Sequence, residues 1–264
     1  MKSISDQVIW ITGASSGIGE AVAYDLSNRG NTLILSARNT NRLKEVKANC
    51  RFPDTVYIEP LDLADHDRMP QHVENVLRAC GTVDILINNA GISQRSLIVD
   101  TQMSVYKKLI DINYLGAVAL TKALLPHFIG KKGGHFVTVT SLMGRFGSPL
   151  RSGYCGAKHG LHGFFDVLRM EHQLDDIHVT LICPGFVQTA VALNALTADG
   201  TAQQKNDLAT GKGLPVAVFA NKMIRSIAQK KFEVYIGRKE VMGIYLKRFF
   251  PKLLHRLILR SDVV

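Results

Sequence analysis

Residues 12–19, TGASSGIG, form a glycine-rich segment that separates a short apolar run from a longer amphipathic one. It follows the apolar run Val8–Thr12, a pattern typical of a buried strand, and leads into the amphipathic run Ile18–Arg29, a pattern typical of a helix. Glycines in such a strand-to-helix turn let the backbone approach a phosphate closely, and the free N–H groups of the helix N-terminus bind pyrophosphate. The spacing Gly-x-x-x-Gly-x-Gly differs from the usual dinucleotide pattern, so a purely structural turn is the alternative.

Short apolar runs and longer amphipathic runs alternate along the rest of the chain. The predicted strands are Val8–Thr12, Thr32–Ala37, Val56–Leu61, Ile85–Asn88, His135–Thr140, Val179–Cys183 and Glu233–Ile236. The predicted helical stretches include Ile18–Arg29, Arg68–Cys80, Met103–Phe128 and Ser152–Gln173. This alternation predicts an α/β fold, a single doubly wound, Rossmann-like parallel sheet of about seven strands flanked by helices.

No linker or internal repeat divides the first 240 residues. Residues 1–240 are therefore predicted to form one dinucleotide-binding catalytic domain. Within it, residues 190–214 show no sustained period, and a loop that long is usually a lid over a binding site, so we predict a substrate lid there. Residues 241–264 are predicted to be a basic amphipathic C-terminal extension.

Composition and charge indicate which kinds of partner and which cellular compartment to expect. The 264 residues carry 32 Lys and Arg against 22 Asp and Glu, a net charge of +10, and 46% are hydrophobic, which excludes a disordered chain. From Arg238 onward seven basic and two acidic residues give +5, which is half of the net charge. The excess is thus concentrated in a basic tail, and no nucleic-acid surface is expected on the body of the protein. The four cysteines form no C-x-x-C pair, so we expect reduced thiols and no metal site. With no signal peptide and no run of about 18 uncharged apolar residues, we expect a cytoplasmic protein without a spanning helix.

The end of the second predicted strand bears on the choice of cofactor. An NAD site places a carboxylate about 20 residues after the glycines, where it accepts from the ribose 2′-hydroxyl. This chain has Ala37 and then Arg38, whose guanidinium suits a 2′-phosphate. NADP(H) is therefore the predicted cofactor, and a merely solvated Arg38 is the alternative.

Polar residues also follow the fourth and fifth predicted strands. Asn88-Asn89-Ala90-Gly91 and Ser141 fall at the carboxyl edge, where such sheets bind ligands, although the asparagines suit support of the strand ends equally well. Tyr154 and Lys158 are four apart on one predicted helix and share a face. A tyrosine, with a pKa of about 10, needs nearby positive charge to act as a base at neutral pH, and Lys158 with a nicotinamide ring supplies it.

Taken together, these motifs resemble the short-chain dehydrogenase/reductase family. The matching features are residues 12–19, Asn88–Gly91, Ser141 with Tyr154-x-x-x-Lys158, and Pro184-Gly185-x-x-x-Thr189. The resemblance implies that Tyr154 is the general acid/base, that Ser141 binds the substrate oxygen, and that Lys158 holds the nicotinamide ribose and lowers the pKa of Tyr154. It also implies that Asn113 positions a relay water, with a locally satisfied buried Asn as the alternative.

The same resemblance implies which residues bind the cofactor. The substrate residues are candidates for lining the pocket. Asp62 matches the acid that contacts adenine, and Thr189 lies near the carboxamide. The full cofactor set is Gly13, Ser15, Ser16, Gly17, Ile18, Gly19, Arg38, Asp62, Asn89, Ala90, Gly91, Tyr154, Lys158, Pro184, Gly185, Val187 and Thr189. The substrate set is Ser141, Met143, Phe146, Tyr154 and Phe186. The basic, apolar C-terminus and Arg38 are similar to the hydroxysteroid dehydrogenase-like branch.

The predicted function is an NADP(H)-dependent oxidoreductase that moves hydride between nicotinamide and a carbonyl or secondary alcohol, on an apolar small molecule. The alternative is a non-catalytic NADP-binding sensor or scaffold, which would not need an acid/base tyrosine. A homodimer or homotetramer is predicted through Ser152–Gln173 and Met103–Phe128, with packing on the sheet as the alternative.

The basic tail, residues 241–260, has its own prediction. Leu246, Phe249, Phe250, Leu253, Leu254, Leu257 and Ile258 form an apolar stripe at helical spacing, and Pro251 interrupts the helix. The stripe predicts peripheral contact with an anionic membrane. Packing on a neighbouring subunit or over the substrate pocket is the alternative.

Overall fold

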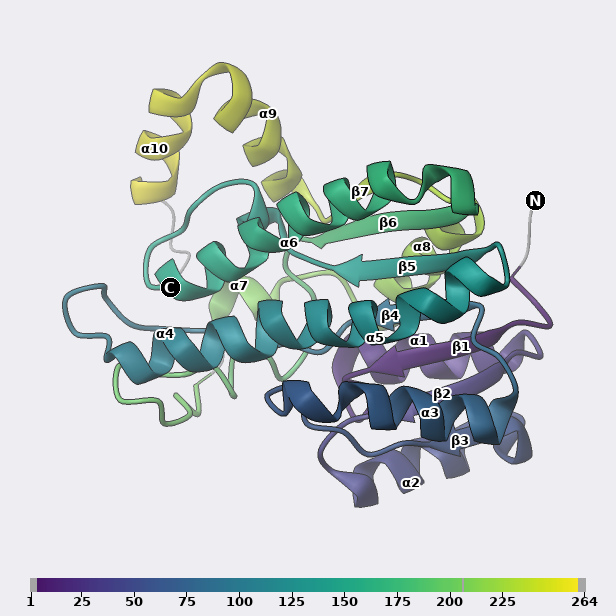
Figure 1. Ribbon diagram of the computed structural model, residues 1–264. Coiled ribbons are helices and arrows are strands. Elements are labelled where there is room, and N and C mark those ends of the chain that lie inside the picture. The colour runs from purple at the N-terminus through teal and green to yellow at the C-terminus, as the bar shows by residue number, and fades with distance from the viewer. Residues whose placement is uncertain (1–3, 206, 261–264) are drawn as a thin grey trace.

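The computed structural model describes residues 4–205 and 207–260, without the side chain of Leu208. Its centre is a seven-stranded parallel sheet in the order β3-β2-β1-β4-β5-β6-β7 (Figure 1). The strands are β1 (Val8–Thr12), β2 (Thr32–Ser36), β3 (Val56–Ile58), β4 (Ile85–Asn88), β5 (Gly134–Val139), β6 (Ile177–Pro184) and β7 (Glu233–Ile236). The order reverses between β1 and β4, so the polar residues after these strands meet at a switch point.

Helices cover both faces of the sheet. One face carries α1 (Gly17–Asn28), α2 (Thr40–Asn49) and α8 (Val216–Ala228). The other carries α3 (Met69–Cys80), α5 (Gly116–Gly130) and α6 (Ser152–Glu171), which lie in front in Figure 1. The predicted fold class is therefore confirmed.

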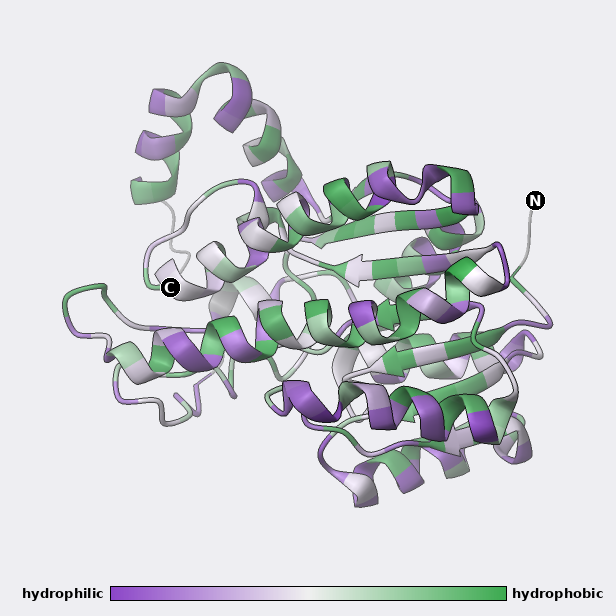
Figure 2. Ribbon diagram, viewed as in Figure 1, coloured by the Kyte–Doolittle hydropathy of each residue, from purple (hydrophilic) through white to green (hydrophobic). Residues whose placement is uncertain are grey.

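Two apolar cores result from the alternation of side chains along each strand. Ile9 and Ile11 of β1 pack with α1 and α8 on one face, whereas Trp10 between them packs with the layer of α3, α5 and α6. All three side chains are fully buried. Figure 2 shows the strands as mostly hydrophobic ribbons inside helices with mixed surfaces, as a sheet covered on both faces requires.

The structure corrects several predicted boundaries. The third strand ends at Ile58 rather than Leu61, although the N–H groups of Glu59 and Leu61 still donate to the carbonyls of Leu35 and Ala37. The sixth strand begins two residues earlier, at Ile177. The sequence interpretation missed α2 and α8, and α2 has only Leu43 and Val46 buried, which is too few for a clear helical period.

The predicted stretch Met103–Phe128 forms one long helical rod. It consists of α4 (Met103–Ile110), a π-helical turn at Asp111–Leu115, and α5. Met103–Gly130 is long and apolar enough to cross a membrane by length and composition alone. The stretch contains charged residues, so it was not predicted as a spanning helix. Its residues Leu120 and Leu124 are fully buried in the core under the sheet, so it serves here as a core helix.

Two segments extend beyond the sheet layers. Residues 190–214 are largely irregular and contain only the short helix α7 (Leu208–Gly211); Asn206, inside this predicted lid, lies outside the described residues. The tail forms α9 (Met242–Phe249) and α10 (Pro251–Arg260), which bend at Phe250 and project from one end of the molecule in Figure 1. Residues 1–3 and 261–264, which the predicted domain and extension included, are also outside the described part.

Candidate functional site

A large cavity of about 1490 Å³ opens at the carboxyl edge of the sheet. All but two of the predicted catalytic, cofactor and substrate residues line this cavity. Those that line it are Gly13, Ser15, Ser16, Gly17, Ile18, Arg38, Asp62, Asn89, Ala90, Gly91, Ser141, Met143, Phe146, Tyr154, Lys158, Pro184, Gly185, Phe186, Val187 and Thr189. Gly19 and Asn113 do not line the cavity but lie directly behind its wall.

The glycine-rich turn is held closed by the residues after β4. The Asn89 amide Nδ2 donates to the Thr12 carbonyl at 2.9 Å and to the Gly13 carbonyl at 3.3 Å. A Cβ on Gly19 would stand 2.3 Å from the Gly13 carbonyl oxygen, and Gly13 and Gly17 have φ values of +65° and +58°. The turn therefore requires glycine, and its shape is a cradle that a side chain would fill.

Two residues at the rim lie where an adenosine end would be held. Arg38 is exposed just after β2 and lines the cavity. Asp62 is exposed and also lines the cavity, and its Oδ1 accepts from the Ala64 N–H at 3.0 Å. The rim thus has one guanidinium and no acidic residue at the end of β2, which fits a 2′-phosphate better than a free 2′-hydroxyl.

Ser141 and Tyr154 meet deeper in the cavity. Ser141 caps the turn after β5, where its Oγ accepts from the Met143 N–H at 3.1 Å. Tyr154 stands in the first turn of α6, whose start is fixed because Gln94 Oε1 accepts from the Gly153 N–H at 2.8 Å. Burial raises the pKa of the Tyr154 phenol, while a hydrogen bond with Ser141 lowers it.

Lys158 lies one helical turn below Tyr154. Its Nζ is 5.9 Å from the centre of the Tyr154 ring and donates to the Val139 carbonyl at 2.8 Å. Burial lowers the pKa of this ammonium to about 8, so it is still mostly charged at neutral pH. A charged donor with only one protein acceptor in this part of the structure has hydrogens left for a ligand hydroxyl.

Asn113 lies in the π-helical turn and is almost fully buried. Its Oδ1 accepts from the Ile92 N–H at 2.7 Å and its Nδ2 donates to the Ile92 carbonyl at 2.8 Å. A Cβ on Gly91 would stand 2.9 Å from Asn113 Oδ1 and 3.4 Å from Lys158 Nζ, so these side chains approach the backbone of Gly91 together. The side chain therefore fixes the loop after β4.

Two buried arginines beside Tyr154 were missed by the sequence interpretation. The guanidinium of Arg95 holds Asp207 through Nε and Nη2, and Arg151 Nη2 reaches Asp207 Oδ2 at 3.3 Å. Among the charges around Tyr154, those of Arg95 and Arg151 lower its pKa most. Arg151 directly precedes α6, where a positive charge opposes the helix dipole, and that position was the available signal.

The tail closes the apolar end of the cavity. Phe146, after Ser141, packs with buried Leu254 of α10 and with Leu246 and Ile258. A Cβ on Gly243 of α9 would stand 2.9 Å from the Phe146 ring, so the tail lies directly on this ring. Of the alternatives for the tail, packing over the pocket is therefore observed for its inner face.

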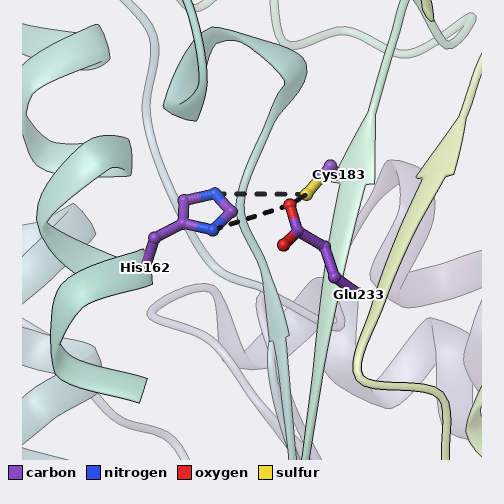
Figure 3. Close-up of side chains that lie close together, drawn as sticks. All are labelled: His162, Cys183 and Glu233. Carbon is purple, nitrogen blue, oxygen red and sulfur yellow. Dashed lines mark hydrogen bonds and ion pairs between the residues drawn. The ribbon is translucent and has the colours of Figure 1, made fainter. Parts of the chain in front are cut away.

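One cluster of metal-binding side-chain types occurs within residues 4–205 and 207–260, although the sequence predicted no metal. His162, Cys183 and Glu233 place one ligand atom each within 4.8 Å of one another behind the cavity (Figure 3). His162 Nε2 is 4.0 Å from Cys183 Sγ, and its Nδ1 is 3.9 Å from Glu233 Oε1. The two imidazole nitrogens thus face different partners.

The cluster fits an ion-pair network better than a metal site. Arg145 binds both oxygens of Glu233, with its Nε donating to Oε1 at 2.8 Å. Burial lowers the pKa of His162 to about 4 and raises that of the Cys183 thiol, so both are neutral at pH 7. A cation there would meet the Arg145 charge and a thiol that resists ionisation. The network ties the turn after Ser141 to α6 and β7.

Known proteins are similar to this chain along most of its length. A family model described as short chain dehydrogenase matches residues 7–199. "Dehydrogenase/reductase SDR family member 7" from Homo sapiens is 42% identical over 94% of this chain and 75% of its own length, and "Dehydrogenase/reductase SDR family member 7B" from Bos taurus is 38% identical over 97% and 81%. A short-chain dehydrogenase/reductase from Burkholderia phymatum, crystallised with NAD, superposes with a TM-score of 0.84 over 96% of both chains at 21% identity, which shows a shared fold.

Proposed function

Because this chain belongs to the short-chain dehydrogenase/reductase family of oxidoreductases, we propose that it moves hydride between NADP(H) and an apolar carbonyl or secondary alcohol. The observation that carries the proposal is the meeting of Ser141, Tyr154 and Lys158 in the cavity that also contains the glycine-rich turn. A non-catalytic sensor or scaffold would need the turn but not a partly buried tyrosine beside a serine and a lysine. The site favours the enzyme.

Each residue of the proposed catalytic group has a separate task. Ser141 Oγ and Tyr154 Oη hold the substrate oxygen, and Tyr154 gives or takes the proton there. Lys158 Nζ holds ribose hydroxyls, and Asn113, with its side chain fixed on Ile92, positions water near Lys158. The cofactor supplies or accepts the hydride. Ser141, Lys158 and Asn113 are buried and Tyr154 is partly buried, which limits the access of bulk water to the proton transfer.

The proposed cofactor contacts follow the cavity wall. The cradle at residues 12–19 takes the pyrophosphate, Asp62 the adenine, and the loop from Pro184 to Thr189 the nicotinamide. Thr189 is close enough to the cradle that a Cβ on Gly17 would stand 3.2 Å from its Cγ2. Arg38 takes the 2′-phosphate and so selects NADP(H) over NAD(H).

Replacing Arg38 should remove this selectivity. We expect the wild-type chain to bind NADPH at least about tenfold more tightly than NADH, which corresponds to ~1.4 kcal/mol. Arg38→Ala should lose that difference because the charge facing the 2′-phosphate is gone, and fluorescence titration measures both affinities. Arg42→Ala is the control, since Arg42 pairs with Glu45 and Glu20 outside the cavity. Equal wild-type affinities would contradict the role of Arg38.

The substrate end of the cavity supports an apolar compound. Met143, Phe146 and Phe186 line it together with Leu246 and Leu254 of the tail. A panel of ketones and aldehydes of increasing chain length, followed by NADPH absorbance, tests the proposal. Turnover that rises with apolar length supports it, whereas tight NADPH binding with no turnover across the panel favours the sensor.

We also propose a homodimer through the outer faces of α5 and α6. Val167 and Met170 are exposed apolar residues on α6. A Cβ on Gly156 or Gly163 would meet nothing within 4 Å, so a second helix can approach closely there. Light scattering at micromolar protein should give a dimeric or tetrameric mass, and a strictly monomeric mass would contradict the proposal.

The outer face of the tail supports a peripheral membrane location on the cytoplasmic side. Phe249, Phe250, Leu253, Leu257 and Leu259 are exposed although the inner face of the tail is packed. The basic residues Lys247, Arg248, Lys252, Arg256 and Arg260 are exposed beside them, and residues 241–260 include no acidic residue. An anionic lipid surface matches both properties.

A further inference from the structure

Two guanidiniums share one carboxylate at the lid side of Tyr154. The side chains of Arg95, Arg151 and Asp207 are 7%, 1% and 6% exposed, so their charges act through a poorly solvated medium. Arg95 comes from the loop after β4 and lines the cavity, whereas Asp207 comes from the predicted lid. Arg95 Nη1 also donates to Ser93 Oγ at 2.8 Å, which fixes the guanidinium in place.

We propose that Arg95, held by Asp207, is a positioning residue that stabilises the phenolate form of Tyr154 together with Arg151. The family pattern of Ser141, Tyr154 and Lys158 does not include these arginines. The effect of the arginines on Tyr154 does not depend on the proposed function. Only the use of the phenolate in proton transfer rests on that function.

The surroundings of Tyr154 leave few other charges to act on it. Its hydrogen-bond partner is Ser141, its own helix presents Cys155 and Lys158, and the segments before it present Arg95 and Arg151. Tyr154 also packs against an apolar cluster formed by Val105 and Leu109 of α4 and by Leu196 of the predicted lid. Lys158 turns its Nζ toward the Val139 carbonyl, so the arginines are the cations that act most on the phenol.

The proposal predicts opposite effects for the two partners. Arg95→Met removes a positive charge and leaves Asp207 paired with Arg151 alone, so the pKa of Tyr154 should rise by about one unit, a tenfold gain in proton affinity. Asp207→Asn keeps both guanidiniums and removes their counter-charge, so the pKa should fall. A merely structural role would give a fall in both variants, because loosening the site relieves the burial that raises this pKa.

Tyrosinate absorbance measured against pH gives the pKa of Tyr154 in each variant without a substrate. The outcome of this titration is therefore independent of the proposed reaction. The curve of each chain minus that of the same chain with Tyr154→Phe isolates Tyr154 from the other tyrosines. Arg95→Lys should restore the wild-type curve, and Arg95→Gln, which keeps hydrogen-bond donors, serves where the Met variant does not fold and should raise the pKa likewise.

Arg169→Met is the matched control, because Arg169 forms a partly buried ion pair with Asp166 toward the far end of α6. It should leave the Tyr154 curve unchanged. A rise in the pKa of Tyr154 with Arg95→Met or Arg95→Gln and a fall with Asp207→Asn support the proposal. An unchanged curve in both, or a fall in both, overturns it.

Discussion

Tyr154→Phe should lower kcat by about 10²–10⁴-fold, the usual contribution of a general acid/base. The variant loses the only group in the proposed mechanism that exchanges a proton with the substrate oxygen. It keeps the ring that packs with Val105, Leu109 and Leu196, so the fold and the affinity for NADPH should be nearly unchanged. Steady-state turnover and NADPH fluorescence titration, measured on the same preparation, separate the two effects.

Tyr24→Phe is the matched control for this substitution. Tyr24 lies on α1 and its hydroxyl hydrogen-bonds to Glu20, away from Ser141 and Lys158. We expect it to retain wild-type turnover. If Tyr154→Phe kept most of its activity, the assignment of proton transfer to Tyr154 would be wrong.

The tail should carry nearly all of the binding to anionic vesicles. At about 1 kcal/mol for each basic residue near an anionic surface, Lys247→Gln/Lys252→Gln/Arg256→Gln should weaken binding by about a hundredfold at low salt. These substitutions leave Leu254 in its packed position and so keep the roof of the cavity. Co-sedimentation with vesicles of phosphatidylcholine and phosphatidylserine measures the effect, and added salt should weaken the wild-type binding too.

The control variant removes three positive charges from helices outside the tail. Lys44→Gln/Lys222→Gln/Arg225→Gln changes three exposed residues of α2 and α8 and should bind as the wild type does. Pure phosphatidylcholine vesicles should bind neither chain. Deletion of the residues after Gly243 should abolish binding as well. A wild-type chain that ignores anionic vesicles at low salt would assign the outer face of the tail to another subunit instead.

Much of the fold was predictable because its signals are local. Ile9 and Ile11 face one core while Trp10 faces the other, so β1 is apolar throughout, as a strand covered on both faces must be. The cradle was predictable for a similar reason, since only glycine fits at Gly19 against the Gly13 carbonyl. Ser141, Tyr154 and Lys158 follow from chain order and helical spacing.

What the sequence could not predict depends on contacts between distant segments. Asp207 is 112 residues from Arg95 in the chain, and nothing near either residue indicates that they pair. The tail shows the same limit: its stripe was visible, but only the packing of Leu254 with distant Phe146 decides that Leu254 is buried while Phe249 is exposed. Helix α2 was missed because its polar face outweighs its two buried residues.

Hydride transfer assisted by Tyr154 is tested most directly by following label from NADPH that carries deuterium at both hydrogen positions of nicotinamide C4. With a ketone that the screen shows to be turned over, the wild-type chain should yield an alcohol with one deuterium at the carbinol carbon, detected by mass spectrometry. Tyr154→Phe should bind the same cofactor and yield almost none. Deuterium-free alcohol from the wild type, or equal labelling by the two chains, would contradict hydride transfer assisted by Tyr154.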